Sequence, residues 1–243
     1  SFWSKDITIE RNYVEGNLSN LADDGDAAIA QISSGVFAAS THTNVIFRNN
    51  IFNQVRGTLS DSVDGLKMYN NLFYKTPRAA GAVSTGGGDN GSSWGTIWRG
   101  NIFFESGGGE ASNSGWYYNG TDGAQATNTT VIADFNFVCG TNGAAKLVAP
   151  PHSSLRWGAN PTTVEASGIN GGDPVFVDAA AGDFRLRSTS PLLDAGDNLS
   201  SEFTTDYLGR TRSGWSIGPF ELPAEPVSRP GANATAIFMR ILN

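Results

Sequence analysis

The sequence is poor in cysteine, histidine and charge, and each shortage excludes a class of protein. A single cysteine, Cys139, leaves no internal disulfide and no cysteine-rich zinc site. Its ordinary role is that of a small buried hydrophobe rather than a catalytic thiol. Two histidines, His42 and His152, give little material for histidine-based metal or triad chemistry. Charged residues make up 16% of the chain, which is too few for the solvent faces of a helical bundle.

The sign of the net charge and the lack of long apolar runs exclude some classes of binding partner. A formal net charge of -7 makes nucleic acid a poor partner. No run reaches the length of a membrane span. No signal peptide is visible, and a strand-like pattern already present at Ile7 indicates a mature or truncated form. Residues that favour turns are abundant. The 30 glycines, with many Asn, Ser and Thr residues, suit one large all-β domain of short strands.

One short template recurs along the chain: apolar, x, apolar, x, x, Asn, apolar, apolar. Its five copies, of which the last is looser, carry Asn12, Asn50, Asn71, Asn101 and Asn136. The shortest interval, from Asn50 to Asn71, is about one coil of a solenoid. The longer intervals add loops rich in Gly, Ser and Asp, at 15–43, 84–94 and 106–129. A fixed core with insertions of variable length is typical of stacked repeats.

The template predicts where its side chains lie. Alternate residues of a strand face opposite sides, so the two apolar positions before each asparagine would point inward and stack about 4.8 Å apart. These inward pairs are Ile7 and Ile9, Val45 and Phe47, Leu66 and Met68, and Thr96 and Trp98. The asparagines fall at the following bend, whose left-handed conformation Asn tolerates, and can hydrogen-bond from coil to coil. The sequence therefore predicts an all-β, right-handed parallel β-helix with long loops on one side.

The coil template resembles the pectin-lyase-like right-handed β-helix superfamily. A second match is similar to the closing segment of many secreted bacterial β-helix proteins, with Pro219 in place of the usual small residue. It comprises residues 172–178, 182–186, 190–196, 205–210 and 217–221. The resemblance covers about residues 6–221 and implies a secreted or cell-surface protein. It says little about activity, because that closing segment occurs in lyases, hydrolases and proteins of no known activity.

The chain is expected to divide into a solenoid and a tail. The β-helix would span residues 1–221, with coils at about 6–141, an irregular excursion at 142–171 and an end piece at 172–221. A Pro-rich linker at 222–233 precedes an extra C-terminal strand at 234–243. This strand either packs back on its own helix or adds to a sheet edge of a neighbouring molecule. The residues for such self-association are Ile237, Phe238, Met239 and Ile241.

The resemblance also suggests a chemistry. β-Helix polysaccharide lyases typically use Lys or Arg as a base, with acidic side chains that hold calcium. The residues that match this pattern are Asp61, Asp64, Lys67 and Arg78, with Lys67 on the outward phase of its strand. A turn with a solvated salt bridge is the competing interpretation. A glycoside hydrolase is less favoured, because neither histidine lies in the Gly-His-Gly context of polygalacturonases.

Two further groups are candidates for binding. Three acidic residues, Asp23, Asp24 and Asp26, would offer oxygen ligands to calcium, although an ordinary acidic loop explains them as well. An outward column runs through the coils and consists of Glu10, Arg48, Tyr69, Arg99 and Asp134. As a sugar-binding face it would use Arg48, Arg99 and Tyr69, together with the loop residues Trp94 and Trp116. As a purely structural feature it would be a row of surface ion pairs.

Two classes of function remain. The first is an extracellular protein associated with carbohydrate, which binds a polysaccharide or cell-surface glycan and acts as a lyase or as a binding protein. The second is a structural or adhesive surface protein without catalytic activity, which assembles through its terminal strand and the open end of its solenoid. The fold resemblance favours the first class, and the incomplete catalytic set favours the second.

Overall fold

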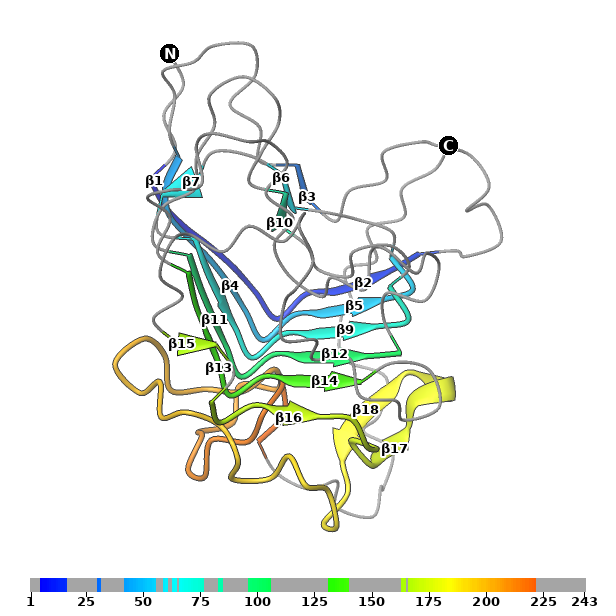
Figure 1. Ribbon diagram of the computed structural model, residues 1–243. Coiled ribbons are helices and arrows are strands. Elements are labelled where there is room, and N and C mark those ends of the chain that lie inside the picture. Colours follow the sequence, from blue (N-terminus) through cyan, green and yellow to red (C-terminus); the bar gives the residue numbers. More distant parts are fainter. Residues whose placement is uncertain are drawn as a thin grey trace.

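The strands of successive coils stack on one another, and the two main strands of each coil meet at a sharp bend (Figure 1). The computed structural model describes residues 5–16, 30–31, 42–55, 59–60, 63–64, 66–76, 83–84, 96–105, 131–139, 163–164 and 166–221. In this part of the chain three sheets are built from parallel neighbours alone. The protein is a parallel β-helix, as the sequence predicts.

Each coil contributes one strand to sheet A, and the strand that follows it in the same coil belongs to sheet B. Sheet A contains β1 (Lys5–Glu10), β4 (His42–Arg48), β8 (Lys67–Tyr69), β11 (Thr96–Arg99), β13 (Val131–Asp134) and β15 (Thr163–Val164), and β7 (Val63–Asp64) pairs with β4. Sheet B contains β2 (Tyr13–Glu15), β5 (Ile51–Asn53), β9 (Leu72–Tyr74), β12 (Ile102–Phe104), β14 (Phe137–Cys139) and β16 (Ile169–Asn170). A small sheet C contains β3 (Ala30–Gln31), β6 (Leu59–Ser60) and β10 (Val83–Ser84).

The bend from sheet A to sheet B has two residues in each of the first five coils. Its first residue has a positive φ in every coil: Arg11, Asn49, Asn70, Gly100 and Phe135. The left-handed conformation therefore belongs to the residue before the repeated asparagine, and the expectation that the repeated asparagine adopts it is wrong. The preceding residue turns the chain from sheet A into sheet B, and the asparagine then directs its amide into the bend.

The five repeated asparagines form a continuous ladder inside the bend. The side-chain Nδ2 of each of the first four asparagines donates to Oδ1 of the asparagine in the next coil, at 2.9–3.0 Å. Each backbone N–H donates to the same oxygen, at 2.9–3.1 Å. From the second coil onward, Nδ2 also donates to a strand carbonyl of the previous coil, such as that of Phe47 for Asn71. The predicted ladder of Asn12, Asn50, Asn71, Asn101 and Asn136 is confirmed.

The interior of the solenoid is apolar. Val45, Phe47, Leu66, Met68 and Trp98 point into it and are at most 1% exposed, and Ile7 and Ile9 pack against this core from the first coil. The side chain of Thr96 lies outside the described residues. On the sheet B side, the rings of Phe52, Phe73 and Phe103 stack with centroids 5.0 and 4.8 Å apart. Aromatic residues thus stack like on like, as repeated coils require.

The stack continues beyond the repeated template. Within residues 142–171, where an irregular course is expected, β15 pairs with β13 and β16 with β14. These two strands make a sixth coil. Gly168 precedes Ile169, the register partner of Phe137, and so occupies the ladder position without an amide. The predicted linker and C-terminal strand at 222–243 lie outside the described residues.

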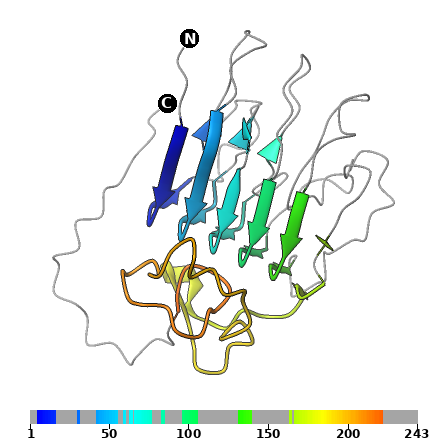
Figure 2. The same ribbon diagram turned by 90° about the vertical axis from the view of Figure 1, so that its left-hand side faces the viewer.

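The end piece wraps around the outside of the bend. It contains an antiparallel pair, β17 (Phe176–Asp178) and β18 (Asp183–Leu186), separated by the 3₁₀ turn η4 (Ala179–Ala181). In Figure 2 the yellow-to-orange segment lies across the lower ends of the sheet A strands. The part of the chain that the structure describes contains no helix long and apolar enough to span a membrane.

Candidate functional site

The outward column of sheet A lies in a single register across the coils. Glu10 pairs with Arg48, Arg48 with Tyr69, Tyr69 with Arg99 and Arg99 with Asp134. Arg48 Nε donates to Glu10 at 2.5 Å. In this column an arginine lies on each side of Tyr69 and an acidic residue at each end, on the outer face of sheet A.

The end piece covers the middle of this column. Tyr69 is 2% exposed and packs with Leu199, Phe203 and Trp215. Its ring stacks with that of Phe203 at a centroid distance of 6.2 Å. The Arg48 guanidinium lies 5.3 Å from the centroid of the same Phe203 ring. The ring of Tyr69 is thus occupied by the protein's own aromatic residues and presents no open face to a sugar.

The basic residues around Tyr69 are also paired with the end piece. Lys67 Nζ lies 2.9 Å from both carboxylate oxygens of Glu202. Arg99 pairs with Asp197, and Arg48 donates to the Glu202 carbonyl at 2.9 Å. Lys67 therefore lies on the outer face of sheet A in a bidentate ion pair, a geometry that supports a role in holding the end piece. Sequence reasoning missed Glu202 and Asp197 because both lie far along the chain.

Burial of Tyr69 predicts a response to alkali. Burial, and then the nearby Glu202, raise the pKa of Tyr69 above its ordinary value of 10.0. A raised pKa in the folded state means that this contribution to stability is complete below pH 10 and is lost as the pH rises further. We expect Tyr69→Phe to remove it, so that melting temperature falls less steeply between pH 9 and 11 in the variant than in the wild type. Parallel curves by circular dichroism would contradict the burial of this phenol.

The outer face of sheet B is covered in the same way. Its outward residues, among them Ile51, Leu72 and Ile102, form a second core with Phe184 and Leu192 of the end piece. The Phe184 ring meets that of Tyr74 edge-on, at 5.0 Å. Cys139 belongs to this core and is 1% exposed. The end piece therefore covers the middle of both outer faces in the described part of the chain.

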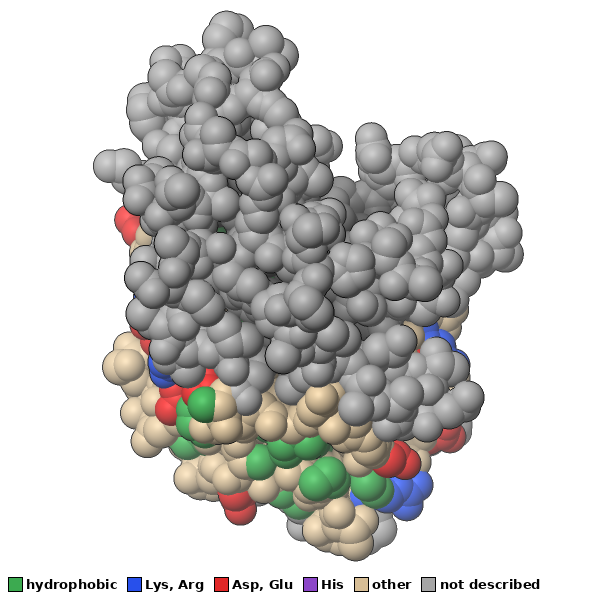
Figure 3. All heavy atoms as spheres, in the orientation of Figure 1, with side chains coloured by type: hydrophobic (Ala, Val, Ile, Leu, Met, Phe, Trp, Pro, Cys, Tyr) green, Lys and Arg blue, Asp and Glu red, His purple; other side chains and the backbone are tan. Residues whose placement is uncertain are grey.

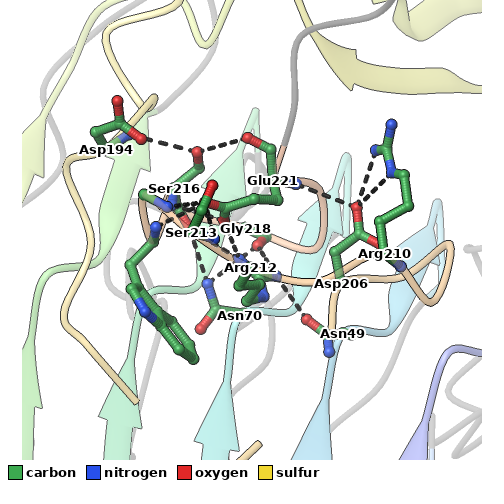
Figure 4. A network of polar contacts seen from close by, with 12 residues as sticks. Asn49, Asn70, Asp194, Asp206, Arg210, Arg212, Ser213, Ser216, Gly218 and Glu221 are labelled. Atoms are coloured by element: carbon green, nitrogen blue, oxygen red, sulfur yellow. Dashed lines mark hydrogen bonds and ion pairs between the residues drawn. The ribbon is translucent and has the colours of Figure 1, made fainter. Parts of the chain in front are cut away.

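A buried ion pair fastens the end piece at the bend (Figure 4). Arg212 and Glu221 are joined at 3.0 Å, with side chains 0% and 1% exposed. Glu221 also accepts four backbone N–H bonds from residues 213–216. Burial lowers the pKa of Arg212 to about 10, so its guanidinium remains charged at neutral pH. The pair is thus a structural latch rather than an acid–base couple.

The latch formed by Arg212 and Glu221 contacts the solenoid through bend residues that have a positive φ. Arg212 donates to Asn49 Oδ1 at 2.7 Å, and Asn49 donates to the Thr205 carbonyl. Asn70 donates to the carbonyls of Ser216 and Gly218 at 2.9 and 3.0 Å. Gly218 has a φ of 95°, and a Cβ there would overlap the side chain of Ile102. The glycine in the closing motif is therefore required by close approach to sheet B.

The variable part of each coil is the connection from sheet B back to sheet A. We call these stretches the return connections: residues 16–41, 54–66, 75–95, 105–130 and 140–162. They differ in length, in contrast to the constant two-residue bend, and they carry the strands of sheet C. Because the end piece covers the middle of both outer faces, the return connections are the part of the sequence where residues can vary without disturbing the described core.

Most of the remaining candidate residues belong to the return connections. Asp64 lies in β7 beside Thr43, and its side chain is outside the described residues. The other candidates there also lie outside them: Asp23, Asp24, Asp26, Asp61, Arg78, Trp94 and Trp116. The proposed assembly residues Ile237, Phe238, Met239 and Ile241 lie outside them as well. Among the described side chains no group of three or more His, Cys, Asp or Glu residues could hold a metal ion.

No protein-family model, no curated protein and no solved structure matches this chain.

The described surface of the protein has few exposed apolar side chains. Figure 3 shows one face of the molecule, on which the apolar side chains of the described residues form only small areas among polar atoms. The exposed large hydrophobic residue of the described chain is Leu208, at 52%. The end piece therefore offers no broad apolar patch of the kind that marks a protein interface.

Proposed function

We propose that the protein is an extracellular, carbohydrate-associated β-helix protein that binds a polysaccharide or cell-surface glycan along its return connections. One observation carries the proposal: length variation is concentrated in these connections, while the end piece covers the middle of the outer faces of both sheets. The resemblance of the coil template and closing segment to the pectin-lyase-like superfamily supports a carbohydrate ligand and a secreted location.

The chemistry of the return connections suits a sugar polymer. They contain Trp94 and Trp116, whose rings can stack on sugar faces, and many Asn, Ser and Thr residues that can hydrogen-bond to hydroxyls. Because coils repeat about every 4.8 Å along the solenoid axis, successive coils would each offer one return connection to a ligand. A linear polymer lying along that axis would meet several of them, and its affinity would be the sum of many weak contacts.

A lyase activity is the enzymatic form of this proposal. Asp61, Asp64 and Arg78 all belong to return connections, where carboxylates would hold calcium against a uronate and a basic residue would take the proton. Lys67 has a different setting, because its Nζ is paired with Glu202 on the outer face of sheet A. We therefore propose that Arg78, rather than Lys67, would supply the base.

Binding and cleavage can be measured in one experiment. We expect saturable binding to at least one polymer in a panel of uronate and neutral polysaccharides, with Trp94→Ala or Trp116→Ala weakening it several-fold. The matched control is Tyr69→Phe, on the covered face, which should bind as the wild type does. If the polymer is cleaved, absorbance at 235 nm should rise in the presence of calcium and stay flat with Arg78→Ala. An absence of binding across the panel would refute the proposal.

The alternative is a structural or adhesive surface protein that assembles through its ends. The observation in its favour is the first coil, where Ile7, Ile9 and Val14 remain only partly buried. Residues 234–243, with their apolar character, would provide an assembling strand. Regular fibres in electron micrographs, lost on deletion of residues 231–243, would favour this alternative over glycan binding.

A further inference from the structure

The junction between the solenoid and the end piece contains the single Asp–Pro bond of the chain, between Asp173 and Pro174. β16, in the sixth coil, ends at Asn170, and β17 of the end piece begins at Phe176. Asp173 is exposed and Pro174 is buried, so the bond lies where the chain passes from the surface into the end piece. An Asp–Pro bond is chemically distinctive, because a side-chain carboxylate stands beside a tertiary amide whose nitrogen carries no hydrogen.

The backbone directly after this bond is strained. Val175 has a φ of 57°, a left-handed conformation that is an outlier for a β-branched residue. The Val175 carbonyl accepts from the Arg187 N–H at 3.0 Å, and the Pro174 carbonyl accepts from Ser190 Oγ at 2.6 Å. Such strain persists only where the surrounding structure imposes it. The end piece therefore holds Val175 in a conformation that its side chain disfavours.

The Asp173 carboxylate is held beside the same bond. Its Oδ1 accepts from the Val175 N–H at 2.7 Å, a hydrogen bond that spans Pro174. On the other side of Asp173, the Gly172 carbonyl accepts from the Cys139 thiol at 3.0 Å. Contacts from both directions thus order the residues around the bond. A carboxylate ordered next to its own backbone carbonyl has lost the freedom that an intramolecular reaction must otherwise remove.

We propose that the bond between Asp173 and Pro174 is a self-cleavage site, at which hydrolysis separates the end piece from the solenoid. A carboxylate oxygen of Asp173 attacks the backbone carbonyl carbon of the same residue. As a cyclic anhydride forms, the C–N bond to Pro174 breaks, its electron pair stays on the prolyl nitrogen, and solvent supplies the proton. Water then opens the anhydride, which leaves Asp173 as a new C-terminus and Pro174 as a new N-terminus.

The fold favours this reaction in two ways. It orders the nucleophile, and cleavage releases Val175 from the conformation that the intact chain imposes. Cys139 and Arg187 also contact this segment, and they donate to backbone carbonyls of residues 172–177 rather than to the Asp173 carboxylate. Water is the sole co-reactant, and Asp173 is exposed to it.

Non-covalent contacts would keep the end piece in place after the cut. Arg212 donates to Asn49, and Asn70 donates to the Ser216 carbonyl, so both hydrogen bonds join residues from opposite sides of the cleaved bond. The two apolar clusters that cover the outer faces also contain residues from both fragments. The product is therefore two chains in one particle. The proposal does not depend on glycan binding.

Mass spectrometry of the full chain during incubation in mildly acidic buffer tests the proposal, at a pH where circular dichroism still shows the native fold. We expect one cut, with a fragment that ends at Asp173 and a fragment that begins at Pro174. Asp173→Ala should abolish the cut, because it removes the nucleophile. Val175→Gly should slow it about tenfold, because glycine adopts a positive φ without strain and keeps the N–H donor.

The unfolded chain provides the comparison that needs no substitution. In concentrated urea at the same pH the strain and the ordering hydrogen bond are lost, so cleavage should be about tenfold slower than in the folded protein. A folded chain that stays intact, or that is cut no faster than the unfolded chain, would overturn the proposal. A cut that persists in Asp173→Ala would also overturn it, because a contaminating protease would then be responsible.

Discussion

Replacing Asn71 by leucine is expected to lower the free energy of unfolding by about 3–5 kcal/mol. Asn71 is fully buried, and its Oδ1 accepts from Asn50 while its Nδ2 donates to Asn101 and to the Phe47 carbonyl. Leucine has nearly the same volume but restores none of these bonds, so buried donors and acceptors lose their partners in two neighbouring coils. Urea denaturation followed by circular dichroism measures the change.

The matched control for this substitution is Asn12→Leu, at the exposed end of the same ladder. Water can replace its partners, so we expect a loss of about 1 kcal/mol or less. A cost of about 1 kcal/mol or less at both positions would mean that the ladder hydrogen bonds add little to stability. That result would leave hydrophobic stacking as the sole source of order in the bend.

The second large effect is expected from Glu221→Ala, which should cost about 3–5 kcal/mol. It leaves the buried Arg212 guanidinium without its ion-pair partner and removes the acceptor for the backbone N–H groups of residues 213–216. The end piece should then loosen from both sheets, and the fluorescence of Trp215, which is 7% exposed, should shift to longer wavelength.

A partly exposed ion pair provides the comparison for the latch. Glu202→Gln breaks the pair with Lys67, whose side chains are 28% and 23% exposed, and should cost less than about 1 kcal/mol. If Glu221→Ala were as mild as Glu202→Gln, with no shift in tryptophan emission, the end piece would be held by apolar contacts alone and the latch would be energetically neutral.

The ladder and the inward pairs could be predicted because they depend on a local pattern. A strand has a period of two and each coil repeats the same phase, so a single copy such as Val45, Phe47 and Asn50 indicates both the core and the bend. The sixth coil lacks that signal because Gly168 replaces the asparagine. Its strands are recognised only through their register with β13 and β14.

The covering of the outer faces could not be predicted in this way. Lys67 and Glu202 are 135 residues apart, and Arg212 and Asn49 are 163 apart. An outward lysine looks the same in a sequence whether it faces solvent or a distant glutamate. The available signal was the presence of Leu199, Phe203 and Trp215 in an otherwise polar segment, which indicated that this segment packs against something apolar.

The most direct test of the account is hydroxyl-radical footprinting read by mass spectrometry, with and without a bound polysaccharide. If the end piece closes the outer faces, Tyr69, Phe203 and Trp215 should stay unmodified in both states. Changes on binding should then be confined to the return connections, including Trp94 and Trp116. Modification of Tyr69 in the free protein, followed by its protection when the polymer is added, would contradict the account and place the glycan on the face of sheet A.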